Sequence, residues 1–92
     1  MTNLKDLNGK KVVTTDAYSL GEVDGIEFDV EKAAITHLRV DLAKEAANEL
    51  RFKKPIMGNV YVCIPLNLVQ AYGHVINLNV PLSHVKTLRE CQ

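Results

Sequence analysis

Residues 22–42 read EVDGIEFDVEKAAITHLRVDL, and this stretch decides the fold class. On both sides of a polar turn at Glu31-Lys32, apolar residues alternate with polar ones, which is the period expected of half-buried strands. The apolar sets predicted to face the core are Ile26, Phe28 and Val30 on the first strand, and Thr36, Leu38, Val40 and Leu42 on the second. Gly25 predicts a bulge or sharp bend within the first strand. Two long strands joined by a short loop form a hairpin, so we expect 22–42 to be the central element of the domain.

Shorter elements are predicted on both sides of this hairpin. Residues 11–15, 59–64 and 74–80 have the composition or alternation of strands. Residues 44–52 are rich in Ala, Glu, Lys and Leu and predict a helical insert of about two turns. Residues 65–73 are typical of a single helical turn closed by glycine, and the tail 82–88 predicts a last short strand or helical turn. Within 65–73 three apolar side chains would point the same way and plug one end of a barrel: Leu66, Val69 and Tyr72.

These elements together predict an all-β fold. The expected architecture is a small closed or partly open antiparallel β-barrel with one short helical insert, because several short strands with glycines at the bends are typical of small barrels. At 92 residues, the chain is expected to be a single domain over 1–92.

Charge and hydropathy limit the kinds of partner that we expect for this chain. Eleven basic residues balance eleven acidic ones, so we expect no direct binding to nucleic acid. No run of about 18 apolar residues is present, and the first residues lack an apolar core, so we expect neither membrane insertion nor a signal peptide. These features predict a cytoplasmic protein. Cys63 and Cys91 match no metal or redox spacing, so reduced thiols are expected, with Cys63 packed as a small core residue.

The sequence offers no recognisable catalytic constellation. Ser19 and Ser83 lie outside any nucleophile-elbow context, and the three histidines have no metal-ligand spacing. The glycine-flanked stretch 21–25 carries acidic residues where a phosphate would sit. We therefore expect a non-enzyme with no catalytic residues, no metal and no cofactor.

An acidic face on the first long strand is the main candidate site. The simplest interpretation is that these carboxylates face solvent and keep an amphipathic strand soluble. The alternative is a docking strip for a basic protein partner, where complementary charge aids encounter rate and specificity. The candidate docking residues are Glu22, Asp24, Glu27, Asp29 and Tyr61. Apolar residues outside the inward sets, notably Ile35, Tyr61 and Val75, predict a self-complementary interface between two copies of the chain.

The order of motifs along the chain resembles the PRC-barrel family. The segments that carry the resemblance are LNGKKV (7–12), LGEV (20–23), FDV (28–30), IPLNLV (64–69) and GHVINL (73–78). They follow one another over roughly residues 4–80, and only the helical insert departs from the minimal family pattern.

This resemblance implies a docking role with no shared catalytic residues. Members of the family occur in a photosynthetic reaction-centre subunit, in a ribosome maturation factor that contacts a small-subunit protein, and as stand-alone archaeal proteins. As a bare barrel, the chain looks most like the archaeal stand-alone group, some of which look like adaptors beside the membrane anchor of the tubulin-like division ring. The resemblance thus implies a homodimeric adaptor in a membrane-associated complex. The alternative it implies is a ribosome-assembly or RNA-processing accessory that docks through a ribosomal protein.

Overall fold

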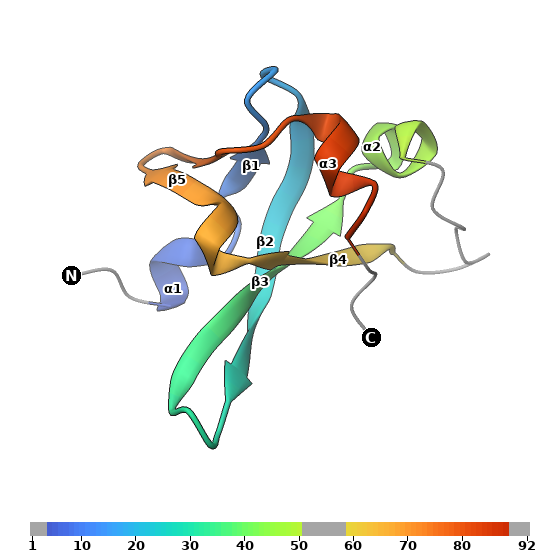
Figure 1. Cartoon of the computed structure of the whole chain (residues 1–92). Coiled ribbons are helices and arrows are strands. Elements are labelled where there is room, and N and C mark those ends of the chain that lie inside the picture. The colour runs from blue at the N-terminus through green and yellow to red at the C-terminus, as the bar shows by residue number, and fades with distance from the viewer. Residues whose placement is uncertain (1–3, 51–58, 89–92) are drawn as a thin grey trace.

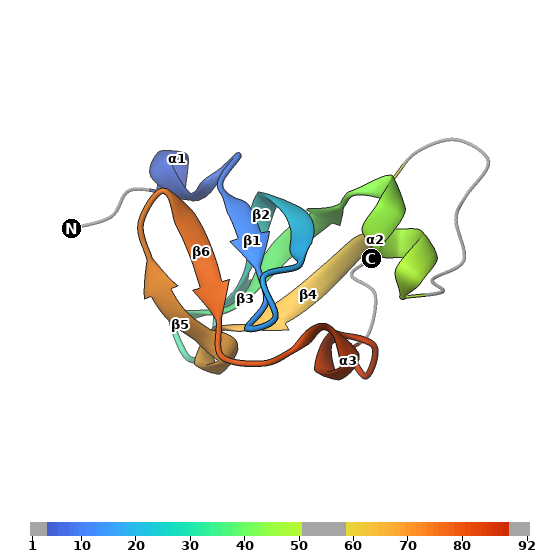
Figure 2. The same cartoon turned by 90° about the horizontal axis from the view of Figure 1, so that it is seen from above.

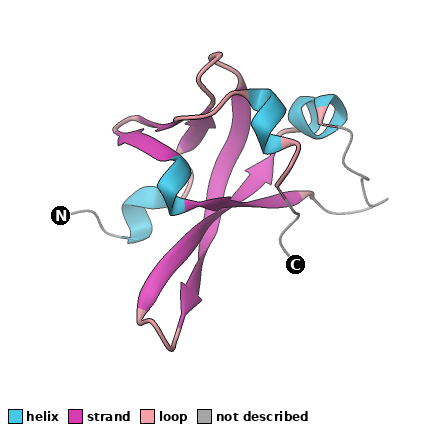
Figure 3. Ribbon diagram, viewed as in Figure 1, coloured by secondary structure: helices cyan, strands magenta, loops and turns pink. Residues whose placement is uncertain are grey.

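The computed structural model describes residues 4–50 and 59–88, and most of them lie in or between strands. The strands are β1 (Lys11–Val13), β2 (Ser19–Asp29), β3 (Ala34–Leu42), β4 (Tyr61–Pro65), β5 (Val69–Tyr72) and β6 (Val75–Leu78). The short helices are α1 (Leu4–Leu7), α2 (Lys44–Glu49), the 3-10 turn η1 (Leu66–Leu68) and α3 (Leu82–Val85) (Figures 1 and 3). None of the helices in these two described ranges is long and apolar enough to cross a membrane.

One curved sheet contains all six strands, in the order β4-β3-β2-β1-β6-β5. The predicted all-β barrel is confirmed in its partly open form, because β4 and β5 are the two ends of the sheet and are not hydrogen-bonded to each other. The sheet is mixed rather than fully antiparallel, since β1 and β6 run parallel while the other neighbours are antiparallel. In Figure 2, β1, β6 and β5 lie side by side.

A bulge in β2 sets which side chains reach the core. Val23 lies opposite Val40 and Gly25 lies opposite Arg39, so Asp24 is an extra residue, as the glycine at this point predicts. The extra residue reverses the alternation, and Val23 and Ile26 consequently both pack on the inner side.

A close approach of two strands explains the glycine at position 21. Gly21 has φ +150°, a conformation that side-chain-bearing residues rarely adopt. A Cβ at this position would lie 2.0 Å from the carbonyl oxygen of Asp41 and 3.0 Å from the backbone nitrogen of Ala43. The chain can therefore pass from β3 into α2 only where β2 carries no side chain.

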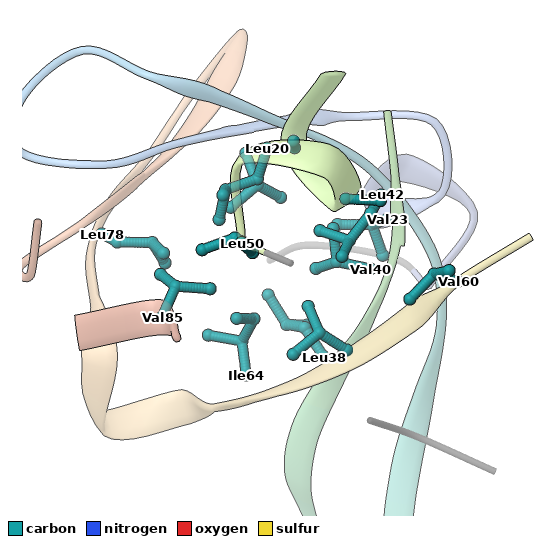
Figure 4. Packing of buried hydrophobic residues seen from close by; sticks show 14 of the residues in the cluster. Leu20, Val23, Leu38, Val40, Leu42, Leu50, Val60, Ile64, Leu78 and Val85 are labelled. Atoms are coloured by element: carbon teal, nitrogen blue, oxygen red, sulfur yellow. The ribbon is translucent and has the colours of Figure 1, made fainter. Parts of the chain in front are cut away.

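The interior is filled by the chain's own side chains. Strand residues supply most of it, and the helices add Ala46, Ala47 and Leu50 around α2 and Val85 of α3, all of which are buried. Figure 4 shows Leu50 and Val85 pointing into the same interior as Ile64 and Leu78. The predicted insert is therefore part of the core, although its residues 51 and 52 lie outside the described ranges.

The predicted plug of the barrel is wrong. Leu66 and Tyr72 are 39% and 41% exposed, and residues 69–72 form strand β5 rather than a helical turn. Pairing of β5 with β6 satisfies the backbone of this segment, which a helical pattern in isolation does not reveal. Leu50 and Val85 occupy the interior instead.

A buried threonine ties the β1–β2 connection to α3. The Thr14 hydroxyl donates to the Asp16 carboxylate and accepts the N–H of Tyr18 at 3.1 Å. The same carboxylate oxygen of Asp16 accepts the N–H of Leu82 at 3.2 Å. The hydrogen bond from Thr14 is the main reason that the pKa of Asp16 lies below its usual value of 3.8.

Cys63 departs from its predicted state. It is buried, as expected, but it lies opposite Arg39 on the outer side of β4, because Val62 and Ile64 take the inward positions. Cys63 is disulfide-bonded, so the prediction of a reduced core thiol is wrong. Cys91 lies outside the described residues.

Candidate docking surface

The outer face of β2, β3 and β4 gathers the predicted docking residues. Residues directly opposite one another across antiparallel strands share a face, and the register aligns Glu22 with Asp41 and Asp41 with Tyr61. Glu27 aligns with His37 on the same face. Glu22 and Glu27 therefore lie on the side of β2 that faces away from the core.

Two of the predicted carboxylates lie beside basic side chains. The Nε atom of Arg39 lies 3.6 Å from an oxygen of Asp24, and Nδ1 of His37 lies 3.5 Å from an oxygen of Glu27. The Arg39 guanidinium also lies over the Tyr61 ring, 4.0 Å from its centroid. Tyr61 thus contacts the chain's own arginine, a cation–π arrangement that holds both side chains against the sheet.

Negative charge nevertheless exceeds positive charge on this face. Burial raises the pKa of Asp41, and the charges of Asp24 and Glu22 raise it further, against the lowering effects of Asn59 and Arg39. The Asn59 side chain donates to the Asp41 carboxylate at 3.1 Å. A single arginine therefore does not neutralise the carboxylates around it.

Asp29 belongs to a different environment from the other candidates. It is the last residue of β2 and half-buried, and its carboxylate accepts the N–H of Lys32 at 3.1 Å. This bond closes the turn over residues 30–33, in which Ala33 has a positive φ of 51°. Asp29 therefore shapes the hairpin tip as well as adding charge to it.

The tip of the β2–β3 hairpin projects beyond the rest of the sheet (Figure 1). Pairing of β1 with β2 ends at Glu22, apart from backbone bonds of Val23, and pairing of β4 with β3 ends at His37. Within the described part of the chain, residues 28–36 therefore make strand pairs only with each other, and Glu27 pairs only with His37. We call residues 27–36 the distal ribbon.

Apolar side chains gather on the distal ribbon, contrary to the predicted core. Phe28 is 55% exposed and Val30 82% exposed, so the prediction that they face inward with Ile26 is wrong for both. Phe28 lies in β2 and Val30 in the turn that follows it, and in the described part of the chain no strand or helix covers these side chains. Thr36 is an extra residue in β3, and Phe28 therefore lies opposite Ile35. The Ile35 side chain is half-buried.

The surface of the hairpin tip is concave but open. A shallow depression of about 440 Å³ is lined by Glu27, Phe28, Asp29, Val30, Glu31, Thr36 and His37. Of the side chains in the described ranges, no group of three or more histidine, cysteine or acidic residues is arranged to hold a metal ion.

The fold and this surface define a small, partly open β-barrel module with a filled interior and a protruding hairpin. The chain belongs to the PRC-barrel family, since the PRC-barrel domain matches residues 1–85. Domains of this family are small β-barrel modules that often mediate protein interactions. No curated protein matches the chain.

Proposed function

We propose that this chain is a non-enzymatic protein–protein interaction module that docks its partner through the distal ribbon. The observation that carries the proposal is the exposure of Phe28 and Val30 on a two-stranded projection. Isolated two-stranded hairpins are at best marginally stable in water, and a third strand or a packed surface stabilises them. A partner that covers the ribbon would supply that layer.

The energy available from Phe28 alone supports a docking role. A phenylalanine buries about 150–250 Å² when fully covered. With 55% of this residue exposed, a partner could remove about 110 Å² from water, worth about 3 kcal/mol at ~25 cal/mol per Å². Aromatic residues of this kind dominate the binding energy of many interfaces.

We further propose a cytoplasmic homodimer that acts as an adaptor in a membrane-associated division complex. This finer proposal is supported by the resemblance to stand-alone archaeal members of the family. Ile35 is half-buried, next to exposed apolar neighbours, and is available to a twofold contact. Sedimentation velocity at low micromolar concentration tests it: a dimer is expected, and monomer alone would contradict the homodimer.

A comparative pull-down tests the docking role. The tagged chain, a Phe28→Ser/Val30→Ser variant and a Leu66→Ser/Tyr72→Ser variant are each used to capture proteins from a lysate of the source organism. Each variant removes two large apolar residues that are exposed, one pair from the ribbon and one pair from η1 and β5. Circular dichroism confirms that each variant is folded.

The expected result is a set of proteins retained by the wild type and by the control variant but lost from the ribbon variant. Division-ring components in that set would support the adaptor role, whereas ribosomal proteins that survive nuclease treatment would favour ribosome assembly. Identical sets from all three baits would refute docking through the distal ribbon.

A further inference from the structure

We propose that the free edge of β2 in the distal ribbon, Glu27–Asp29, binds a basic, extended segment of the partner protein as an added β-strand. This inference rests on the proposed docking role of the ribbon and specifies the chemistry of the partner.

The backbone of the ribbon provides the first argument. In the described ranges, β1 pairs with β2 no further than Glu22, and Val23 makes the last backbone bonds with the segment preceding β1. The outward backbone groups of Glu27–Asp29 thus have no strand beside them among the described residues. An unpaired strand edge is a template for another strand, whose main-chain hydrogen bonds supply affinity.

The other edge of the ribbon is less accessible. Pro65 ends β4 opposite His37, and the chain then turns into η1, which packs beside β3. A strand added next to Ala34–Thr36 would have to pass this turn. The edge of β2 is therefore the better position for an incoming strand.

Charge identifies the incoming strand as basic. Residues 22–36 contain five carboxylates and one lysine, a formal charge of −4 in a chain that is neutral as a whole. Glu27 and Asp29 fall on one face of β2, and Phe28 falls on the other, opposite Ile35. A complementary strand would alternate lysine or arginine on the first face with apolar residues on the second.

The same charge argues against a second copy on this edge. Antiparallel pairing of two β2 edges about Phe28 would place Glu27 of each copy opposite Asp29 of the other. Like charges on neighbouring strands are destabilising, so self-pairing on this edge is disfavoured. A homodimer would have to use a surface that leaves this edge of β2 free.

Peptide binding to the full chain tests the inference. The probe is Thr-Lys-Val-Lys-Val-Lys-Thr, compared with the same peptide carrying Glu for Lys and with one N-methylated at alternate residues. Amide shifts in ¹⁵N-labelled protein report the position, and a titration reports the affinity. The protein variants are Glu27→Lys/Asp29→Lys and, as a charge-matched control, Glu45→Lys/Glu49→Lys on the exposed side of α2.

The expected result is binding of the lysine peptide with shifts centred on Glu27–Asp29. The ribbon variant should weaken it by about tenfold or more, and the α2 variant should leave it nearly unchanged. Equal binding of the N-methylated peptide would overturn strand addition, and equal binding of the glutamate peptide would overturn the basic partner. Shifts centred elsewhere would overturn the position.

Failure of this inference is distinguishable from failure of the proposed function. If no peptide binds while the Phe28→Ser/Val30→Ser variant still loses its captured proteins, docking through the ribbon stands and strand addition is refuted. If the captured proteins are unaffected by that variant, the docking role itself fails.

Discussion

Replacing Gly21 by alanine tests whether the close approach of β2 to the β3–α2 junction holds the barrel together. The added Cβ would lie 2.0 Å from the carbonyl oxygen of Asp41, and carbon and oxygen atoms that are not bonded do not approach so closely. Both groups are backbone, so no flexible side chain can move aside. The two strands must separate locally or Gly21 must leave its φ of +150°.

Both responses lower the free energy of unfolding. Overpacking within a well-packed region costs about 1–3 kcal/mol, and a strained φ at a residue with a side chain costs about 1–3 kcal/mol. The expected loss is therefore about 2–6 kcal/mol, against a total stability of about 5–14 kcal/mol for a domain of this length. The melting temperature should fall by at least about 8 °C, since each kcal/mol shifts it by about 4–8 °C.

Urea unfolding followed by circular dichroism measures the effect, with Gly25→Ala as the matched control. Gly25 lies in the same strand, but a Cβ there would have no atom within 4 Å, and its φ is not positive. The control should match the wild type or gain slightly, because alanine reduces the entropy of the unfolded chain. Equal unfolding midpoints for Gly21→Ala and Gly25→Ala would refute the reasoning.

Three further substitutions probe charge and backbone. Burial and neighbouring carboxylates raise the pKa of Asp41 above 3.8, so the folded state loses stability as the pH rises through the raised pKa. In urea titrations, Asp41→Asn should therefore be more stable than the wild type at pH 7 and should lose this advantage below pH 3.8. The pKa of Asp16 is shifted in the opposite direction, because the hydrogen bond from Thr14 lowers it. Asp16→Asn should therefore be less stable than the wild type at pH 7, and the difference in stability should shrink as the pH falls below 3.8 through the lowered pKa. Ala33 has a φ of 51°, which asparagine tolerates better than alanine, so Ala33→Asn should raise the thermal midpoint by an amount equivalent to a few tenths to about 1 kcal/mol, and an unchanged midpoint would contradict strain at this turn.

Local alternation predicted the central hairpin well. The inward positions Leu38, Val40 and Leu42 are buried, and the bulge at Gly25 lies where the glycine indicated it. These features are set by the side-chain period of a strand and by the backbone freedom of glycine, both of which are visible in the sequence.

Features that depend on distant parts of the chain were not predictable in this way. Phe28 and Val30 keep the inward period, but whether an opposing layer reaches them depends on where β1 and β4 stop. The parallel pairing of β1 with β6, and the pairing that makes residues 69–72 a strand, likewise depend on partners elsewhere in the sequence.

The sequence predicted that the candidate docking residues share a face, but it did not predict which side chains surround them. Glu22, Asp24 and Glu27 lie on the outer side because of the bulge in β2, and Arg39 and His37 approach two of them. The sequence pattern assigned Phe28 and Val30 to the core and therefore missed the exposed apolar side chains on which our proposal rests. An aromatic residue close to a hairpin turn was the available signal.

The central position of β1 has a consequence for folding during synthesis. β1 is the only strand joining β2 to β6 in the described sheet, and Lys11 pairs with Val75, 64 positions later (75 − 11). At ~5–20 residues per second, the ribosome takes roughly 3–13 s to add these residues. The β2–β3 hairpin, built from near neighbours, can form early, while one edge of β1 waits for β6. A nascent chain therefore exposes unpaired edges at β1 and at the distal ribbon for seconds, and among the described residues a later strand closes only the first.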